Sequence, residues 1–87
     1  GYCDTQSGLI GEIKGEEGQV SFTLNDVSGE ACLLADEAYT FTLDTPIKKY
    51  WSAMILAASH TNKRMAVRFD LCSVRGDKRV MYLYQDF

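Results

Sequence analysis

The 87-residue chain has little of what most enzymes and nucleic-acid-binding proteins use. It contains one histidine, one proline and three cysteines, and twelve Asp and Glu residues outnumber nine Lys and Arg residues, giving a net charge of −3 at neutral pH. A catalytic triad needs its histidine positioned between a nucleophile and a carboxylate, and a zinc site needs several histidines or cysteines brought together. Modules that bind nucleic acids usually carry a basic excess. The composition therefore argues against both classes, and we expect no enzymatic activity, no metal and no cofactor.

Long hydrophobic runs are also missing. The longest run covers residues 53–58, whereas a transmembrane helix needs about 20 apolar residues. The content of 46% hydrophobic and 24% charged residues is typical of a folded chain, and the length predicts a single domain over residues 1–87. A chain this short has a thin core, which a cross-link or an oligomer interface would supplement. Because it begins with Gly1 rather than Met, we expect that the chain has been processed or recloned, so that any signal peptide would already be absent from it.

Hydrophobic residues alternate with polar residues in several short segments, which is the pattern of half-buried strands. The segments are residues 9–14, 20–24, 39–43, 65–71 and 80–85. Glycines at both ends of residues 15–18 predict a hairpin turn between the first two. Residues 25–30 and 73–79 are rich in turn-forming residues and are predicted to be loops. In the last strand, this alternation places Val80, Tyr82 and Tyr84 on one face.

Between the third and fourth strands the period changes to that of a helix over residues 46–61. Asp44 or Thr45 can cap its first N–H groups, and Pro46 suits the first turn. Asn62 tolerates the left-handed conformation that ends many helices. The apolar positions that repeat at helical spacing are Ile47, Tyr50, Trp51, Met54 and Ala58.

The resulting order, β-β-β-α-β-β, is the element order of the OB-fold. That fold is mainly β, with five strands closed into a small Greek-key barrel and one helix covering an end. Closure also removes the exposed sheet edges that short strands would otherwise present. The alternative is a split α+β sandwich in which the helix covers an open sheet.

Few residues offer chemistry of their own. His60 falls at the predicted helix C-terminus, where a capping role fits better than general-base catalysis, and Cys72 has no positioned histidine to activate it. Arg75, Lys78 and Arg79 share one predicted loop before Tyr82 and Tyr84, an arrangement that could bind single-stranded nucleic acid, although the acidic total weakens this interpretation. The aromatic residues are expected mostly in the core or an interface, but an exposed one could stack on a sugar.

The whole pattern resembles the B subunits of AB-type bacterial toxins, such as those of cholera toxin, heat-labile enterotoxin and subtilase cytotoxin. Residues 41–46 lead into a helix that carries Tyr50, Trp51 and the apolar run 53–58. Residues 63–69 follow the helix and precede a cysteine and a final strand. The resemblance covers nearly the whole chain.

This resemblance implies a secreted or periplasmic, non-catalytic subunit that binds host cell-surface glycans, assembles as a ring of five and can accompany an enzymatic A subunit. In such rings the helices line a central pore. The pore-side candidates here are Lys48, Lys49, Ser52, Ser59 and Lys63. The glycan-binding candidates, near the start of the first strand, are Thr5, Gln6 and Ser7.

The resemblance also implies a disulfide. In cholera-like B subunits a cysteine before the first strand bonds to one near the end of the strand after the helix, and Cys3 and Cys72 hold those places. Cys32, before the third strand, is the alternative partner of Cys72. Closing a loop of about 70 residues would contribute roughly 4 kcal/mol in the chain-entropy model. Three reduced cysteines in a cytosolic core remain the competing interpretation.

Two other functions compete with the glycan-binding subunit. One is the single-stranded nucleic-acid module described above. The other is a structural or inhibitory partner of another secreted protein, built on the same barrel without affinity for sugars.

Overall fold

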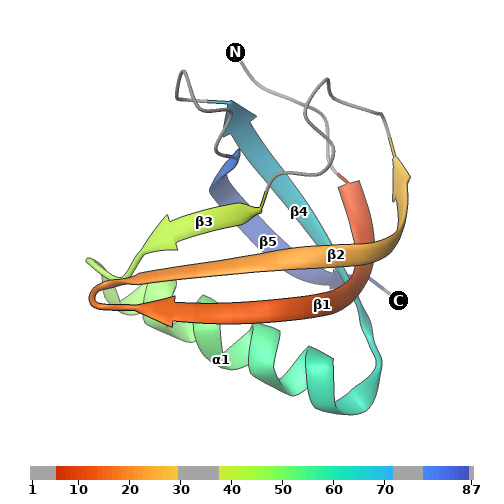
Figure 1. Cartoon of the computed structure of the whole chain (residues 1–87), viewed down its shortest axis with the longest axis horizontal. Coiled ribbons are helices and arrows are strands. Elements are labelled where there is room, and N and C mark those ends of the chain that lie inside the picture. Colours follow the sequence, from red (N-terminus) through yellow and green to blue (C-terminus); the bar gives the residue numbers. More distant parts are fainter. Residues whose placement is uncertain (1–5, 30–37, 72–77, 87) are drawn as a thin grey trace.

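The computed structural model describes residues 6–29, 38–71 and 78–86 and shows a closed barrel of five strands with one helix (Figure 1). The elements in chain order are β1 (Gln6–Glu16), β2 (Gln19–Gly29), β3 (Tyr39–Thr42), α1 (Pro46–Thr61), β4 (Arg64–Leu71) and β5 (Lys78–Asp86). The strands lie around the barrel in the order β1-β2-β3-β5-β4. The predicted mainly β, OB-like barrel is confirmed, and its closure excludes the open sandwich.

The barrel closes where the sequence predicted, between the start of the chain and the strand after the helix. β1 and β4 are antiparallel, with register partners from Gln6 with Val67 to Leu9 with Arg64. The three cysteines lie outside the described residues, so the Cys3–Cys72 and Cys32–Cys72 pairings stay predictions.

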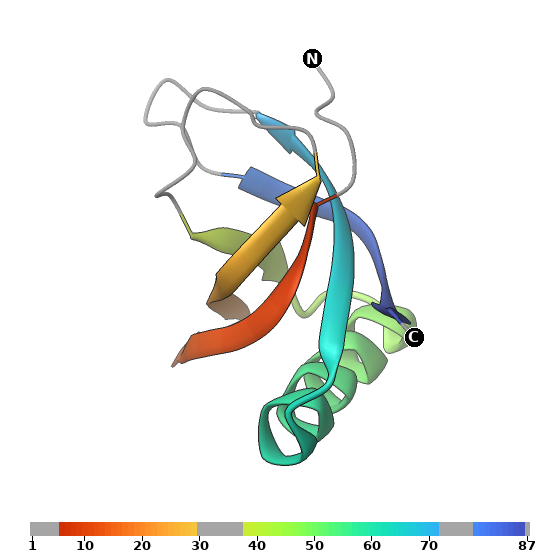
Figure 2. The ribbon, with the colours of Figure 1, turned by 90° about the vertical axis from the view of Figure 1, so that its right-hand side faces the viewer.

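α1 begins and ends as its capping residues predict. Thr45 has an extended backbone, and its Oγ1 accepts a hydrogen bond from the Lys48 N–H at 3.4 Å. Asn62 has a φ of 55°, and the Lys63 N–H donates to the Ala58 carbonyl at 3.1 Å. The helix lies across one end of the barrel, as Figure 2 shows from the side. Among the residues that the structure describes, no helix is long and apolar enough to span a membrane.

The core is built around aromatic rings from several elements. The Phe22 and Tyr39 rings stack with centroids 5.3 Å apart, and Phe69 meets Tyr39 edge-on at 5.2 Å. Trp51 of α1 meets Phe41 edge-on at 5.4 Å, which fastens the helix to β3. Such pairs add about 0.5–1.5 kcal/mol each beyond the apolar area that they bury.

β2 differs from its prediction because it does not end at Leu24. It continues to Gly29 through the segment that was predicted to be a loop. Asp26 has a φ of 52°, and between the pairs Ser7–Ser28 and Leu9–Asn25 the strand β2 advances one residue more than β1. The extra residue forms a β-bulge. The turn-forming residues of this segment are therefore accommodated by a bulge within β2 rather than by a loop.

β5 also contains a bulge, and it corrects the predicted face of the last strand. Arg68 pairs with Tyr82 while Phe69 pairs with Val80, so Met81 is the extra residue. Across a bulge the alternation of faces shifts by one residue. Val80 and Leu83 are therefore buried, whereas Tyr82 and Tyr84 are 42% and 47% exposed.

Candidate functional site

The outer surface of the barrel carries the best-defined polar arrangement. Among residues 6–29, 38–71 and 78–86, no group of three or more His, Cys, Asp or Glu side chains could hold a metal ion. His60 is exposed in the last turn of α1. The polar arrangement lies on outward-facing residues of β1, β2, β4 and β5.

Four outward-facing residues form a row across four neighbouring strands, which we call the Ser–Tyr row. In spatial order they are Ser28 of β2, Ser7 of β1, Ala66 of β4 and Tyr84 of β5, each the register partner of the next. Register partners point to the same side of a sheet, about 5 Å apart. The row therefore places two hydroxyl groups and an exposed aromatic ring on one continuous surface.

The neighbouring row faces the interior and contains one of the predicted glycan-binding residues. Gln6 is 3% exposed, and its Oε1 accepts a hydrogen bond of 2.6 Å from the Tyr39 hydroxyl. Its register partner Val67 is fully buried. Of the three predicted residues, Ser7 thus belongs to the outer surface, Gln6 does not, and Thr5 lies outside the described residues.

The serine end of the row is held by Arg64, which reaches from β4 across β1 to β2. Its Nη2 donates to the Ser28 hydroxyl at 3.0 Å and to the Ser7 carbonyl at 3.1 Å. The same guanidinium pairs with the Asp26 carboxylate at 3.3 Å. An ion pair this exposed contributes less than about 1 kcal/mol to stability. The contacts chiefly fix the orientation of the two serines.

The two serine hydroxyls bond to each other and keep capacity for a ligand. Their oxygens lie 2.9 Å apart, so one hydroxyl proton is used between them and the other is available. Gly8, next to Ser7, permits the close approach of β1 and β2, because a Cβ there would lie 2.6 Å from the Asn25 carbonyl oxygen. The backbone thus positions Ser7 as firmly as its side-chain contacts do.

The tyrosine end of the row is an exposed aromatic surface. The Tyr82 and Tyr84 rings stack with centroids 6.2 Å apart and an interplanar angle of 25°. Ala66 points outward but is only 2% exposed, because larger neighbouring side chains cover it. Within the described residues, Ala66 therefore separates the tyrosines from the serines along the row.

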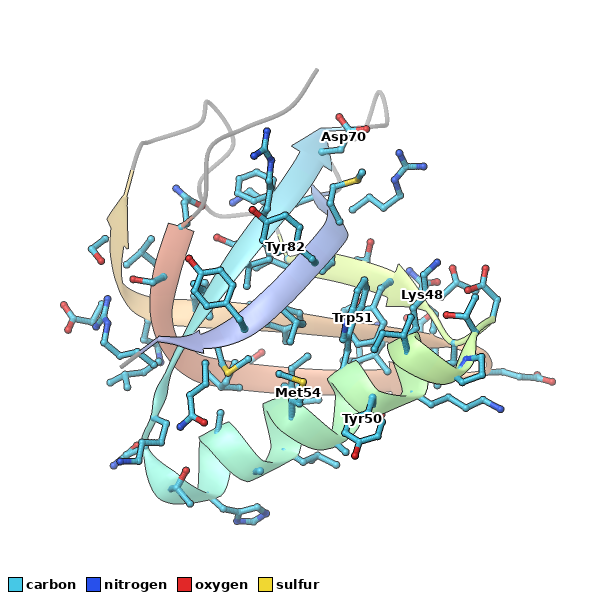
Figure 3. The ribbon with its side chains drawn as sticks, turned by 180° about the vertical axis from the view of Figure 1, so that it is seen from behind. Lys48, Tyr50, Trp51, Met54, Asp70 and Tyr82 are labelled. Carbon is cyan, nitrogen blue, oxygen red and sulfur yellow. The ribbon has the colours of Figure 1, made fainter. Side chains whose placement is uncertain are left out.

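Charged residues border the row on β4. Arg64, Ala66 and Arg68 occupy alternate positions and point to the same side. Arg68 is the register partner of Tyr82. Further along the same ladder the Arg79 guanidinium pairs with the Asp70 carboxylate at 3.0 Å; Figure 3 labels Asp70 and Tyr82 on this side of the barrel. Arg64 and Arg68 thus flank Ala66 on the outer side of β4, and the Asp26 carboxylate balances the charge of Arg64.

The predicted basic loop does not form one cationic surface. Lys78 is fully buried, with its Nζ 4.7 Å from the Tyr39 ring centroid and 5.3 Å from that of Phe69. Arg79 is exposed but paired with Asp70, and Arg75 lies outside the described residues. The interpretation of Lys78 as a surface cation is wrong, because its ammonium group lies against the aromatic core.

The predicted pore-side residues on α1 lie on one side of the helix at 100° per residue. The Lys48 ammonium pairs with the Asp44 carboxylate at 3.0 Å, and this hydrogen-bonded cation holds the pKa of Asp44 below its usual value of 3.8. The Ser52 and Ser59 hydroxyls donate to the backbone carbonyls three residues earlier, at 2.8 Å. Lys49 is exposed, and Lys63 is exposed beyond the end of α1. The structure contains no second copy against which a pore-lining role can be tested.

Sequence reasoning found Ser7 but missed Ser28, Asp26 and Arg64. The first two fall in the segment predicted to be a loop, where no strand register could be assigned. The partners of Arg64 are 36–57 residues away in the sequence. The only available signal was Asp26, since Asp is one of the few residues that accept a left-handed backbone inside a strand.

No family model, curated protein or solved structure matches the chain. The resemblance to toxin B subunits therefore stays an expectation from the sequence pattern.

Proposed function

We propose that this protein is a secreted, non-catalytic subunit that binds glycans on the outer face of its barrel, through the Ser–Tyr row. The observation that carries the proposal is the placement of Ser7 and Ser28 beside the stacked tyrosines on one surface. Sugars present hydroxyl groups at their edges and C–H groups on their faces. Hydroxyl side chains bond to the former, and the electron-rich face of an aromatic ring attracts the latter.

The spacing fits a glycan of more than one sugar ring. Ser7 and Tyr84 lie on strands separated by β4, which places their backbones about 10 Å apart. One ring stacked on Tyr84 leaves room for a second at the serines. Arg64 and Arg68 lie on β4 beside this path.

We also propose, from the resemblance, that the subunits form a ring of five. Two strand edges support association. Among the described residues, β1 has no partner other than β2 beyond Leu9, and β5 has none other than β4 after Arg79. A contact that joins one edge of a subunit to the other edge of the next subunit is heterologous. Such contacts close into a ring when the rotation between neighbouring subunits permits it. An enzymatic A subunit is the partner that the resemblance suggests.

A glycan array probed with the labelled protein tests the proposal, followed by calorimetric titration with a soluble glycan that gives a signal. We expect hits among glycans of two or more sugar rings. Tyr84→Ser and Ser7→Ala should each weaken binding about tenfold, because each removes roughly 1–1.5 kcal/mol of contact.

Matched controls separate this site from the rest of the surface. Tyr50→Ser changes an exposed tyrosine on α1, and Ser52→Ala removes a hydroxyl that bonds to its own helix; both should bind the soluble glycan like the unmodified protein. An array without hits, or equal affinity for all four variants, would contradict the proposal. Salt-dependent binding of single-stranded oligonucleotides in its place would favour the nucleic-acid module.

A further inference from the structure

α1 has a second apolar side that faces away from the barrel. Trp51, Ile55 and Ala58 are buried against the strands, as expected for a surface helix. The side that we call the outer stripe is separate from them and includes the most exposed large hydrophobic residue described, Tyr50 at 69%. At 100° per residue its members fall within an arc of about 120°. They are the exposed Ile47, Tyr50, Ala53 and Ala57 and, at the edge toward the barrel, the half-buried Met54, which also packs against the core.

A hollow of about 320 Å³ opens at the C-terminal end of this stripe. Its walls are mainly apolar and combine the last turns of α1 with the adjacent ends of β4 and β5. The lining residues are Met54, Ala57, Ala58, Thr61, Lys63, Met65 and Gln85. Tyr50 lies about two turns away toward the N-terminus, as the labels of Tyr50 and Met54 in Figure 3 help to locate. One face of the molecule thus carries both a protruding aromatic side chain and a hollow that can hold one.

We propose that α1 packs antiparallel against α1 of a second copy, with Tyr50 of each copy inserted into the hollow of the other. A protrusion and a hollow on the same face complement each other in both directions only when a two-fold axis relates the copies. An axis passing between Ala53 and Met54 sets Tyr50 opposite Ala57 of the second copy. A parallel arrangement would instead bring the two Tyr50 side chains together and leave both hollows empty.

The charges at the ends of α1 complement each other in this arrangement. The same axis brings Asp44, just before the helix, toward Lys63, just after the helix, in the other copy. The first turn of α1 contains Lys48 and Lys49 and no acidic residue, which opposes the positive N-terminal end of its own dipole. Antiparallel packing brings Lys49, next to the edge of the stripe, nearer the negative C-terminal end of the second helix, whereas Lys48 lies on the other side of α1 and is paired with Asp44.

The stripe also permits close packing, but its size limits the strength of the contact. Ala53 and Ala57 are small enough for the helix axes to approach to about 8 Å. A helix of 16 residues is about 24 Å long, so one pair buries less than the roughly 1,200 Å² of a stable interface. We therefore expect a weak dimer with a dissociation constant in the micromolar range or above. The Ser–Tyr row contributes no residue to the stripe or to the hollow, so the contact does not depend on the proposed glycan binding.

Sedimentation equilibrium of the whole chain over a range of concentrations tests this contact. Association should fall at least tenfold in Tyr50→Ser, which removes the inserted ring, and in Ala57→Trp, which fills the hollow. Tyr82→Ser and Leu56→Ser remove exposed hydrophobic side chains outside the stripe and should leave association unchanged. Circular dichroism and thermal melts establish that each variant is folded.

A charge exchange tests the orientation of the helices. Asp44→Lys should weaken association, and Asp44→Lys combined with Lys63→Asp should restore it, because the opposite charges again meet across the axis. A folded chain that stays monomeric at all concentrations, or an oligomer that Tyr50→Ser leaves intact, would overturn the proposal. A ring of five whose mass is unchanged in both Tyr50→Ser and Ala57→Trp would also overturn the proposed helix contact. That result would not contradict the proposed glycan binding.

Discussion

Tyr39 and the Tyr82–Tyr84 pair lie on opposite sides of the same barrel wall, although all three tyrosines occupy strands with alternating sequences. Tyr39 is 2% exposed, between the Phe22 and Phe69 rings, and its hydroxyl donates to Gln6. Tyr82 and Tyr84 are almost half exposed and stack on each other outside. The same kind of side chain occupies both environments, so strand register decides which tyrosine stabilises the core and which is available to a ligand.

A single extra residue creates this difference in β5. Val80 and Tyr82 would share a face in a regular strand, but the bulge at Met81 places Val80 inside and Tyr82 outside. Leu83 then occupies the interior position that regular alternation would have given to Tyr82 or Tyr84. A change in the number of residues in this strand is therefore the most direct way to exchange the two environments.

The largest effect is expected from deleting Leu83. The deletion moves Tyr84 toward an interior position that fits a leucine, and it removes a buried side chain worth about 2–5 kcal/mol. A urea titration monitored by tryptophan fluorescence should then show no cooperative unfolding transition. Deleting Met81 is the matched control. It turns the bulge into a regular ladder and keeps Tyr82 outside, so the protein should remain folded with a loss of at most about 1–2 kcal/mol; equal damage from both deletions would contradict the role of the bulge.

Truncation of single rings should give the next largest difference. Tyr39→Ala removes a buried aromatic ring and should lower the free energy of unfolding by about 3–5 kcal/mol. Tyr84→Ala should lower it by less than about 1 kcal/mol, because the site is exposed. Tyr39→Phe keeps the ring but loses the bond to Gln6, at a cost of about 1–2 kcal/mol. Urea denaturation of the variants measures these values, and similar losses at positions 39 and 84 would show that the two environments are energetically alike.

Alkaline pH should distinguish the two kinds of tyrosine by a smaller amount. Burial raises the pKa of Tyr39 from 10.0 to about 12. Between these values the unfolded chain loses the phenol proton while the folded chain keeps it, so stability is complete below pH 10 and falls as the pH rises to about 12. The loss amounts to roughly 2–3 kcal/mol. Urea midpoints at pH 9 and pH 11.5 should therefore differ more in the unmodified protein than in Tyr39→Phe, whereas Tyr84→Phe should behave like the unmodified protein.

Local signals made the helix predictable and non-local pairing made the binding face hard to predict. Thr45, Pro46 and Asn62 act within one turn of the helix ends, so the bounds 46–61 could be read directly from the sequence. The prediction of β2 failed after Leu24, since a bulge at Asp26 uses the same residue types as a loop.

The candidate site also contains residues that the sequence could suggest and residues that only the strand pairing reveals. Ser7 could be named as a candidate from the resemblance, but only pairing with β4 shows that it points outward while Gln6 points inward. Arg64 could not be associated with the serines, because only closure of the barrel brings it within reach of Ser7 and Ser28. The faces of Tyr82 and Tyr84 depend on the bulge in β5, which alternation alone does not reveal.

The parallel contact between β3 and β5 comprises two residue pairs, Tyr39 with Lys78 and Thr40 with Arg79, whereas β4 and β5 pair over eight. Because the β3–β5 contact is so short, these two strands can separate while the longer antiparallel ladders of the barrel stay paired. Such partial opening needs less free energy than global unfolding. It would hydrate Lys78 and the Tyr39 hydroxyl first, so solvent enters the core of this barrel from the side of its most polar interior residues.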